Sequence, residues 1–310
     1  ILFPILENLE VTAAARIDDY TGFGTTTNPK ISFIYRPVDW LRFRGSYNTS
    51  FRVPTFNQVF NGITESPYSG RDLADPVRCP GGIPNTTDPN CVLIQPNILT
   101  GGNLNLGPES AEQFSLGVVI EPADRYSLSF DWWRIAVDSA IVILTERQLI
   151  DNAAIFPDRF IRDGTGMVTA IDRTWINAGG RRTQGLEISF RGAEAAFGGN
   201  LTFGLDGTYL LQKREALTPT SGLGGSLIGQ FTFAGDLGLR WKHNAFISWT
   251  NEDWTVSLSQ IFRSGYRNQA LPGIANGSVV ESSTGLVAIT GTGGNGTNLN
   301  IGVDVIGAGS

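Results

Sequence analysis

The chain has 310 residues, of which 17% are charged, against about a quarter in an average soluble domain. Its 23 basic and 29 acidic residues give a net charge of −6, which argues against a nucleic-acid partner, because phosphate binding needs a clustered basic surface. The longest purely apolar run, Ala140–Leu144, is far shorter than the ~20 residues of a membrane-spanning helix. The N-terminal segment lacks signal-peptide features, so we expect any export signal to be removed or upstream.

Apolar and polar residues alternate along several long segments. In Trp40–Phe51 the odd positions are mainly apolar and the even positions mainly polar, which predicts a strand with two different faces. The same pattern occurs in Leu9–Asp19, Gln113–Glu121, Leu201–Leu211 and Trp254–Arg263. Soluble strands usually have about 5 to 6 residues, whereas strands that cross a bilayer need about 9 to 11, so the lengths favour a membrane.

Short and long connections alternate along the chain. Short ones are predicted at 37–39, 121–125, 192–199 and 250–253, and long ones at 20–28, 52–110, 139–172 and 213–236. Aromatic residues mark the short-turn ends, as in an interfacial girdle: Trp40, Tyr126, Trp249 and Trp254. Outer-membrane barrels have short periplasmic turns and long external loops. The prediction is an all-β fold: a partial transmembrane antiparallel up-and-down β-barrel with long extracellular loops, with a soluble β-sandwich as the alternative.

Two local irregularities give further expectations. The apolar phase of Tyr126–Asp138 slips between Trp132 and Ile135, which predicts a β-bulge. Thr145–Asn152 has a helical pattern, with Thr145 as N-cap, inside a long loop.

Four short motifs follow one another along the chain. They are RIDDYTGFGTTTNPK (Arg16–Lys30), SFRVPTF (Ser50–Phe56), GNLNLGPESAEQFSLG (Gly102–Gly117), and Asn177 followed by TQGLEIS (Thr183–Ser189). In this order they resemble the C-terminal barrel of TonB-dependent outer-membrane receptors. The resemblance implies a partial barrel of about nine strands over residues 1–264, fewer than the roughly 22 of the family. Residues 265–310 are expected to be a loop plus a partial strand, or an atypical tail.

The resemblance also implies a function. A receptor of this family lies in the bacterial outer membrane, binds a scarce small ligand at its external loops, and imports it by TonB-dependent active transport. The implied partners are the TonB energy-coupling complex, acting through an N-terminal plug missing from this sequence, the extracellular ligand and outer-membrane lipid. A ferric siderophore is the commonest ligand class, with carbohydrate, peptide or cobalamin as alternatives. A passive porin and a secreted all-β enzyme are the rival interpretations.

Candidate ligand-binding residues lie in the longest predicted loop: Phe56, Phe60, Tyr68, Arg71 and Arg78. Candidate polar residues of the barrel lumen are Arg16, Arg42, Arg44 and Arg52, which we expect to bind either carboxylates of a plug or an anionic ligand. In the same long loop Cys79 and Cys91 favour a disulfide, because the exterior is oxidising and a metal or catalytic thiol lacks partners. No catalytic residue, metal site or cofactor is predicted.

Overall fold

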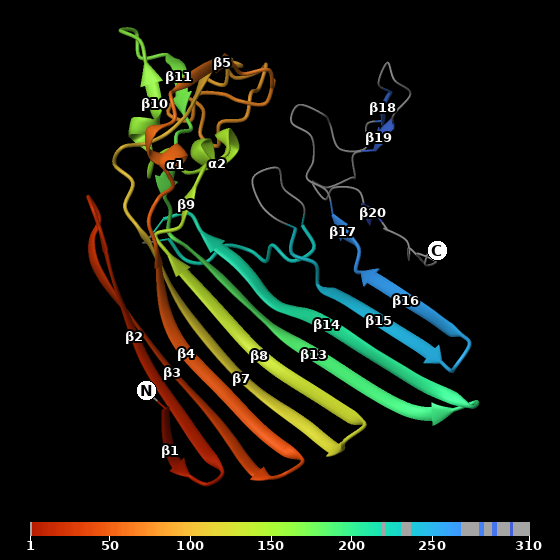
Figure 1. The fold of residues 1–310 in the computed structure, drawn as a ribbon. Coiled ribbons are helices and arrows are strands. Elements are labelled where there is room, and N and C mark those ends of the chain that lie inside the picture. Colours follow the sequence, from red (N-terminus) through yellow and green to blue (C-terminus); the bar gives the residue numbers. More distant parts are fainter. Residues whose placement is uncertain are drawn as a thin grey trace.

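The structure is a computed structural model that describes residues 2–218, 221–230 and 237–267, together with three short strands nearer the C-terminus. Its main feature is one curved antiparallel sheet of ten strands, β1-β2-β3-β4-β7-β8-β13-β14-β15-β16, with β1 and β16 at the edges (Figure 1). The strands are β1 Leu2–Leu6, β2 Leu9–Tyr20, β3 Gly24–Val38, β4 Leu41–Arg52, β7 Glu109–Ala123, β8 Tyr126–Asp138, β13 Gly180–Ala196, β14 Gly199–Ala216, β15 Trp241–Thr250 and β16 Thr255–Arg263. An all-β fold with long membrane-length strands is therefore confirmed.

The remaining elements are short. Above one end of the sheet lie α1 Phe56–Phe60, β5 Thr64–Pro67, β6 Asn97–Thr100, β9 Ile141–Val142, α2 Glu146–Asp151, the 3-10 turn η1 Pro157–Arg159, β10 Phe160–Arg162, β11 Val168–Asp172 and β12 Ile176–Asn177 (Figure 1). Beyond the main sheet, β17 Tyr266–Arg267 pairs with β20 Asn298–Leu299, and β18 Val279–Glu281 pairs with β19 Val287–Ile289. Most of the predicted tail, 265–310, lies outside the described residues. No helix in the described part of the chain is long and apolar enough to cross a membrane.

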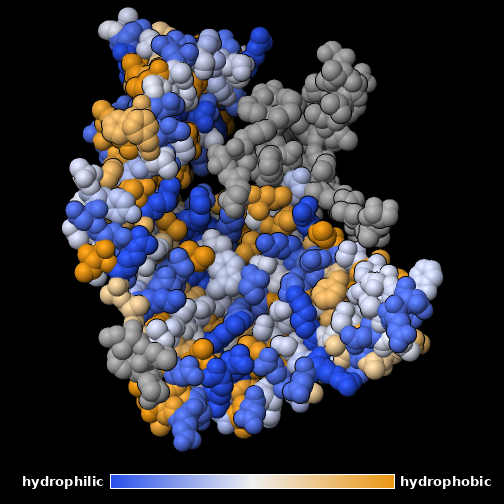
Figure 2. Space-filling view, in the orientation of Figure 1, coloured by the Kyte–Doolittle hydropathy of each residue, from blue (hydrophilic) through white to orange (hydrophobic). Residues whose placement is uncertain are grey.

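Cross-strand register keeps the two faces of the sheet distinct. Phe43, Val118 and Phe130 lie side by side on β4, β7 and β8 and belong to the apolar face. On the opposite face, hydrophilic side chains cover much of the sheet visible in Figure 2. Because side chains alternate along each strand, a one-residue slip would exchange the faces, so this pattern fixes the register.

A glycine allows an ion pair to span a whole strand on the polar face. Arg44 of β4 and Asp131 of β8 both pair in register with Gly117 of the intervening β7. The Arg44 guanidinium donates two hydrogen bonds to the Asp131 carboxylate, at 2.7 and 2.6 Å. A Cβ atom at position 117 would lie 1.9 Å from Asp131 Oδ1, so only glycine leaves room for this contact.

Several predicted boundaries are wrong. The long connection expected at 20–28 is a turn at 21–23, because the Thr-rich segment continues β3 down to Gly24. The strand ending at Leu211 continues to Ala216, because a register shift between Gln184 and Gly185 leaves Leu211 as an extra residue and reverses the alternation beyond it. The strand β1 was not predicted, since its nearly continuous apolar sequence carries no period-two signal.

The bulge predicted between Trp132 and Ile135 is also wrong. Both neighbours of β8 pair with it in unbroken register through this segment. Arg134 stays on the apolar face, opposite Phe114, and Ile135 on the polar face, opposite Gln113. The apparent slip of phase arises because the strand carries a polar residue on its apolar face and an apolar residue on its polar face at these two positions, and not because of an extra residue.

Replacing Leu116 by arginine tests the assignment of the faces. Leu116 is 48% exposed on the apolar face in the middle of β7. Against lipid, Leu116→Arg should destabilise the full-length protein by about 2 to 4 kcal/mol, because a charge at the bilayer midplane loses its hydration. Urea unfolding from phospholipid vesicles measures the change. The neighbouring Ser115→Arg, on the polar face, is the control, and equal losses for the two variants would contradict the assignment.

Candidate functional site

Two long loops, 53–108 and 139–179, fold together into a cap at one end of the sheet (Figure 1). Their strands form a four-stranded sheet, β10-β11-β6-β5, in which β11 of the second loop runs parallel to β6 of the first. A buried apolar core lies between the loops, made of Leu73, Ile94, Ile98, Leu144, Leu149, Ile150, Phe160, Val168 and Ile171. Because both loops contribute to this core, the cap is a packed unit that holds its surface residues in fixed positions.

The two short helices of the cap begin with the same capping arrangement. In α1 the Thr55 Oγ1 accepts the Gln58 N–H, and the Gln58 side chain accepts the Thr55 N–H. In α2 Thr145 and Gln148 do the same, which places the N-cap where the sequence predicts it. Each capping box thus satisfies two backbone N–H groups at the start of its helix.

Ion pairs join the two loops inside the cap. Arg162 of β10 donates to both oxygens of the buried Asp75, at 2.6 and 2.9 Å, and the Val77 N–H donates to the same carboxylate. Burial raises the pKa of the Asp75 carboxyl group, but these hydrogen bonds outweigh it and hold the pKa below its usual value. Asp75 therefore stays charged and ties the first loop to the second.

A disulfide joins Cys79 and Cys91 within the first loop. Arg147 of α2 reaches across to this segment, donating to the carbonyl oxygens of Gly81 and Gly82 while pairing with Asp151 of its own helix. Gly82 has a φ of 58°, and a Cβ there would lie 2.2 Å from Ile150 Cγ2. The disulfide loop is thus held closely against α2.

The predicted ligand-binding residues have different surroundings. Phe56 and Phe60 are 75% and 58% exposed, with ring centroids 4.9 Å apart, and form an aromatic pair on α1. Arg71 is also exposed. Tyr68 packs against the cap core and donates to Asp72 at 2.7 Å, and Arg78 donates to the Thr165 carbonyl oxygen at 3.3 Å. The structure therefore leaves Phe56, Phe60 and Arg71 most available to a ligand.

The four predicted lumen arginines lie on the polar face and each has a carboxylate partner. Arg16 pairs with Asp18 at 2.7 Å, Arg42 with Glu121 at 3.1 Å, Arg44 with Asp131 at 2.6 Å and Arg52 with Glu109 at 2.5 Å. Their charges are compensated within the wall. The pairs made by Arg42, Arg44 and Arg52 join different strands, whereas Arg16 and Asp18 both lie on β2.

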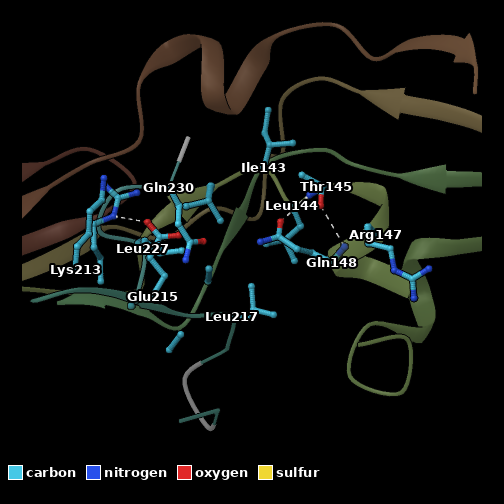
Figure 3. A pocket seen from close by; sticks show the side chains of 16 residues that line it. Ile143, Leu144, Thr145, Arg147, Gln148, Lys213, Glu215, Leu217, Leu227 and Gln230 are labelled. Carbon is cyan, nitrogen blue, oxygen red and sulfur yellow. Dashed lines mark hydrogen bonds and ion pairs between the residues drawn. The ribbon is translucent and has the colours of Figure 1, made fainter. Parts of the chain in front are cut away.

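A pocket of about 260 Å³ lies where the second loop meets the ends of β13 and β14 (Figure 3). Its lining includes the apolar Leu144, Leu217 and Leu227 as well as the Arg181–Glu215 ion pair, at 2.9 Å. Lys213, 4% exposed, also lines it. The sequence pattern does not predict this pocket, because position 213 lies in a predicted loop and the contacts join distant segments. The consecutive Leu210 and Leu211 are the sign of the bulge that the sequence offers.

Removing the Asp75 charge should loosen the cap. In the full-length protein, Asp75→Asn leaves the Arg162 guanidinium without its carboxylate and should lower local stability by about 3 kcal/mol. Because the folded pKa of Asp75 is depressed, its contribution is present above the ordinary pKa of about 3.9 and is lost as the pH falls through the lower folded value.

Hydrogen exchange of the amides in β10 and β11 measures this loosening. The exposed Asp158→Asn, in the same cap, is the control and should leave exchange unchanged. Unchanged protection in Asp75→Asn at neutral pH would contradict a structural role for the pair.

A family model described as TonB dependent receptor-like, beta-barrel matches residues 2–304. Similar solved structures include the siderophore receptor PirA from Pseudomonas aeruginosa, with 16% identity, a TM-score of 0.53, and coverage of 85% of this chain and 38% of that one. PirA from Acinetobacter baumannii has 17% identity and a TM-score of 0.56, and the match covers 92% of this chain and 35% of that one.

A variant of the ferric enterobactin receptor PfeA from Pseudomonas aeruginosa, in complex with enterobactin, has 15% identity and a TM-score of 0.61. The match covers 93% of this chain and 35% of that one. The comparison with curated protein sequences gave no match. The chain spans 38% and 35% of the length of the two PirA structures that it matches. The family model matches nearly the whole chain and describes an outer-membrane β-barrel, in agreement with the two-faced sheet: the chain belongs to the TonB-dependent receptor family.

Proposed function

We propose that the full-length protein imports a ferric siderophore across the outer membrane, with energy supplied by the TonB complex through an N-terminal plug. The observation that carries this proposal is the packed cap above a polar lumen wall, which presents exposed aromatic and cationic groups on the external side. The similar solved structures include siderophore receptors, which supports this ligand class over carbohydrate, peptide or cobalamin.

The proposed capture surface is formed by Phe56, Phe60 and Arg71. Rigid aromatic side chains give a large contact area at low cost in conformational entropy, and an arginine can pair with an anionic ferric complex. Tyr68 and Arg78 are proposed to position this surface, because both are engaged within the cap. The lumen arginines are proposed to line the transport path after the plug has moved.

Dependence on TonB tests the transport proposal. Uptake of iron-55 enterobactin, the first probe of a siderophore panel, should saturate with concentration and disappear in cells that lack TonB or a proton-motive force. Uptake that persists without TonB and rises linearly with concentration would identify a passive porin. Growth on carbohydrate, peptide or cobalamin as the limiting nutrient, without siderophore uptake, would reassign the ligand.

Changing the aromatic pair tests the capture surface. The double variant Phe56→Ser/Phe60→Ser should weaken binding of ferric enterobactin to whole cells about tenfold, because buried aromatic contacts dominate interface energies. Phe197→Ser is a matched control, since Phe197 is 91% exposed in the turn between β13 and β14 at the opposite end of the sheet. Equal affinity of the double variant and the control would rule out this surface for the probe.

A further inference from the structure

The outward face of the sheet carries a group of arginines near the external ends of β8, β13 and β14. Arg182 of β13 lies directly opposite Arg214 of β14 in the register. Arg134 of β8 lies two positions from the level of Arg182, opposite Gln184. We call Arg134, Arg182 and Arg214 the outward arginine patch.

The extra residue in β14 is what turns Arg214 outward. Below the shift at Leu211, odd-numbered residues such as Tyr209 belong to the apolar face. Above it the alternation is reversed, so Lys213 and Glu215 line the pocket on the inner side, and Arg214 lies on the outer side. Without this bulge the patch would lack its third arginine.

Two directly opposed arginines repel each other, which makes the arrangement unfavourable without an anion. Arg182 is partly compensated, because its guanidinium donates to Asp138 Oδ1 at 2.7 Å and to the Val137 carbonyl oxygen at 2.8 Å, both on β8. Arg134 and Arg214 are exposed, and within the described part of the chain neither has an ion pair or hydrogen bond.

The other charged groups on this rim leave the patch positive. Two carboxylates of the described residues lie on this rim. Asp138 forms an ion pair with Arg182, and the exposed Glu112 of β7 lies opposite Ala136 in the register. A fourth cation, Arg240, stacks its guanidinium 5.7 Å from the Tyr209 ring centroid. The cations therefore outnumber the carboxylates on this part of the outer surface.

The height of the patch relative to the membrane follows from the aromatic residues below it. Tyr209 of β14 packs on Trp241 of β15, with 6.4 Å between the ring centroids. Such rings lie at the level of the lipid headgroups, and arginine side chains just beyond them extend into the phosphate region. The long connections of this barrel are external, so the leaflet concerned is the outer one.

We propose that the outward arginine patch binds the phosphate group of a phosphorylated lipid of the outer leaflet. Planar guanidinium groups on neighbouring strands can share one phosphate by charge-assisted hydrogen bonds, which would relieve the repulsion between Arg182 and Arg214. A lipid fits better than free phosphate, because the aromatic and apolar band directly below the patch would hold its hydrophobic part.

Lipid binding to the full-length receptor in phosphatidylcholine nanodiscs tests this proposal. The probe is bisphosphorylated lipid A, with phosphate-free lipid A for comparison, and native mass spectrometry gives the bound fraction. Arg134→Gln/Arg214→Gln should weaken binding about 30-fold, because each basic residue near an anionic lipid surface contributes roughly fivefold. Arg134→Lys/Arg214→Lys should retain most of the affinity, since the charges remain.

Arg125→Gln is the matched control, because Arg125 is an exposed arginine in the turn between β7 and β8 at the opposite end of the sheet. Heat-modifiable mobility on gels checks that each variant keeps a folded barrel. Three results would overturn the proposal: undiminished binding by the glutamine double variant, equal binding of phosphate-free lipid A, or complete displacement of the lipid by millimolar inorganic phosphate.

Discussion

The structure depends on one constraint: within a bilayer every backbone N–H and C=O must be hydrogen-bonded inside the protein. Long antiparallel strands meet this requirement through their neighbours, and the two faces of each strand are then free to differ. One face of this sheet is apolar, while the other carries the ties between strands. The sheet therefore has no buried apolar centre of its own, and the apolar core of the described residues lies in the cap.

Ion pairs join neighbouring and next-neighbouring strands on the polar face of the sheet. The Arg44–Asp131 contact spans three strands because Gly117, on the middle strand, has no side chain. The glycine thus leaves room for an ion pair between the two outer strands. The cap also contains such an ion pair, since Asp75 and Arg162, which are 87 positions apart in the sequence, join its two loops. Both cases place charges where partial burial strengthens them and keeps the geometry rigid.

The bulge at Leu211 links the features at the external end of the sheet. By reversing the alternation of β14, it turns Lys213 and Glu215 toward the pocket and Arg214 toward the outside. A single extra residue thus contributes to a cavity under the cap and to a charged outer rim. Bulges are common near functional regions for this reason, since they redirect side chains without breaking the sheet.

The sequence by itself determined the strand faces, the membrane-length strands and the helix at Thr145, because alternation and capping are local patterns of period two and of fixed short spacing. It also pointed to the cysteine pair and to the exposed Phe56 and Phe60. Only the tertiary structure decided which arginines have carboxylate partners, how the two loops pack into one cap, and which side of β14 Lys213 occupies. Those features depend on contacts between residues far apart in the chain, and no local pattern encodes such contacts.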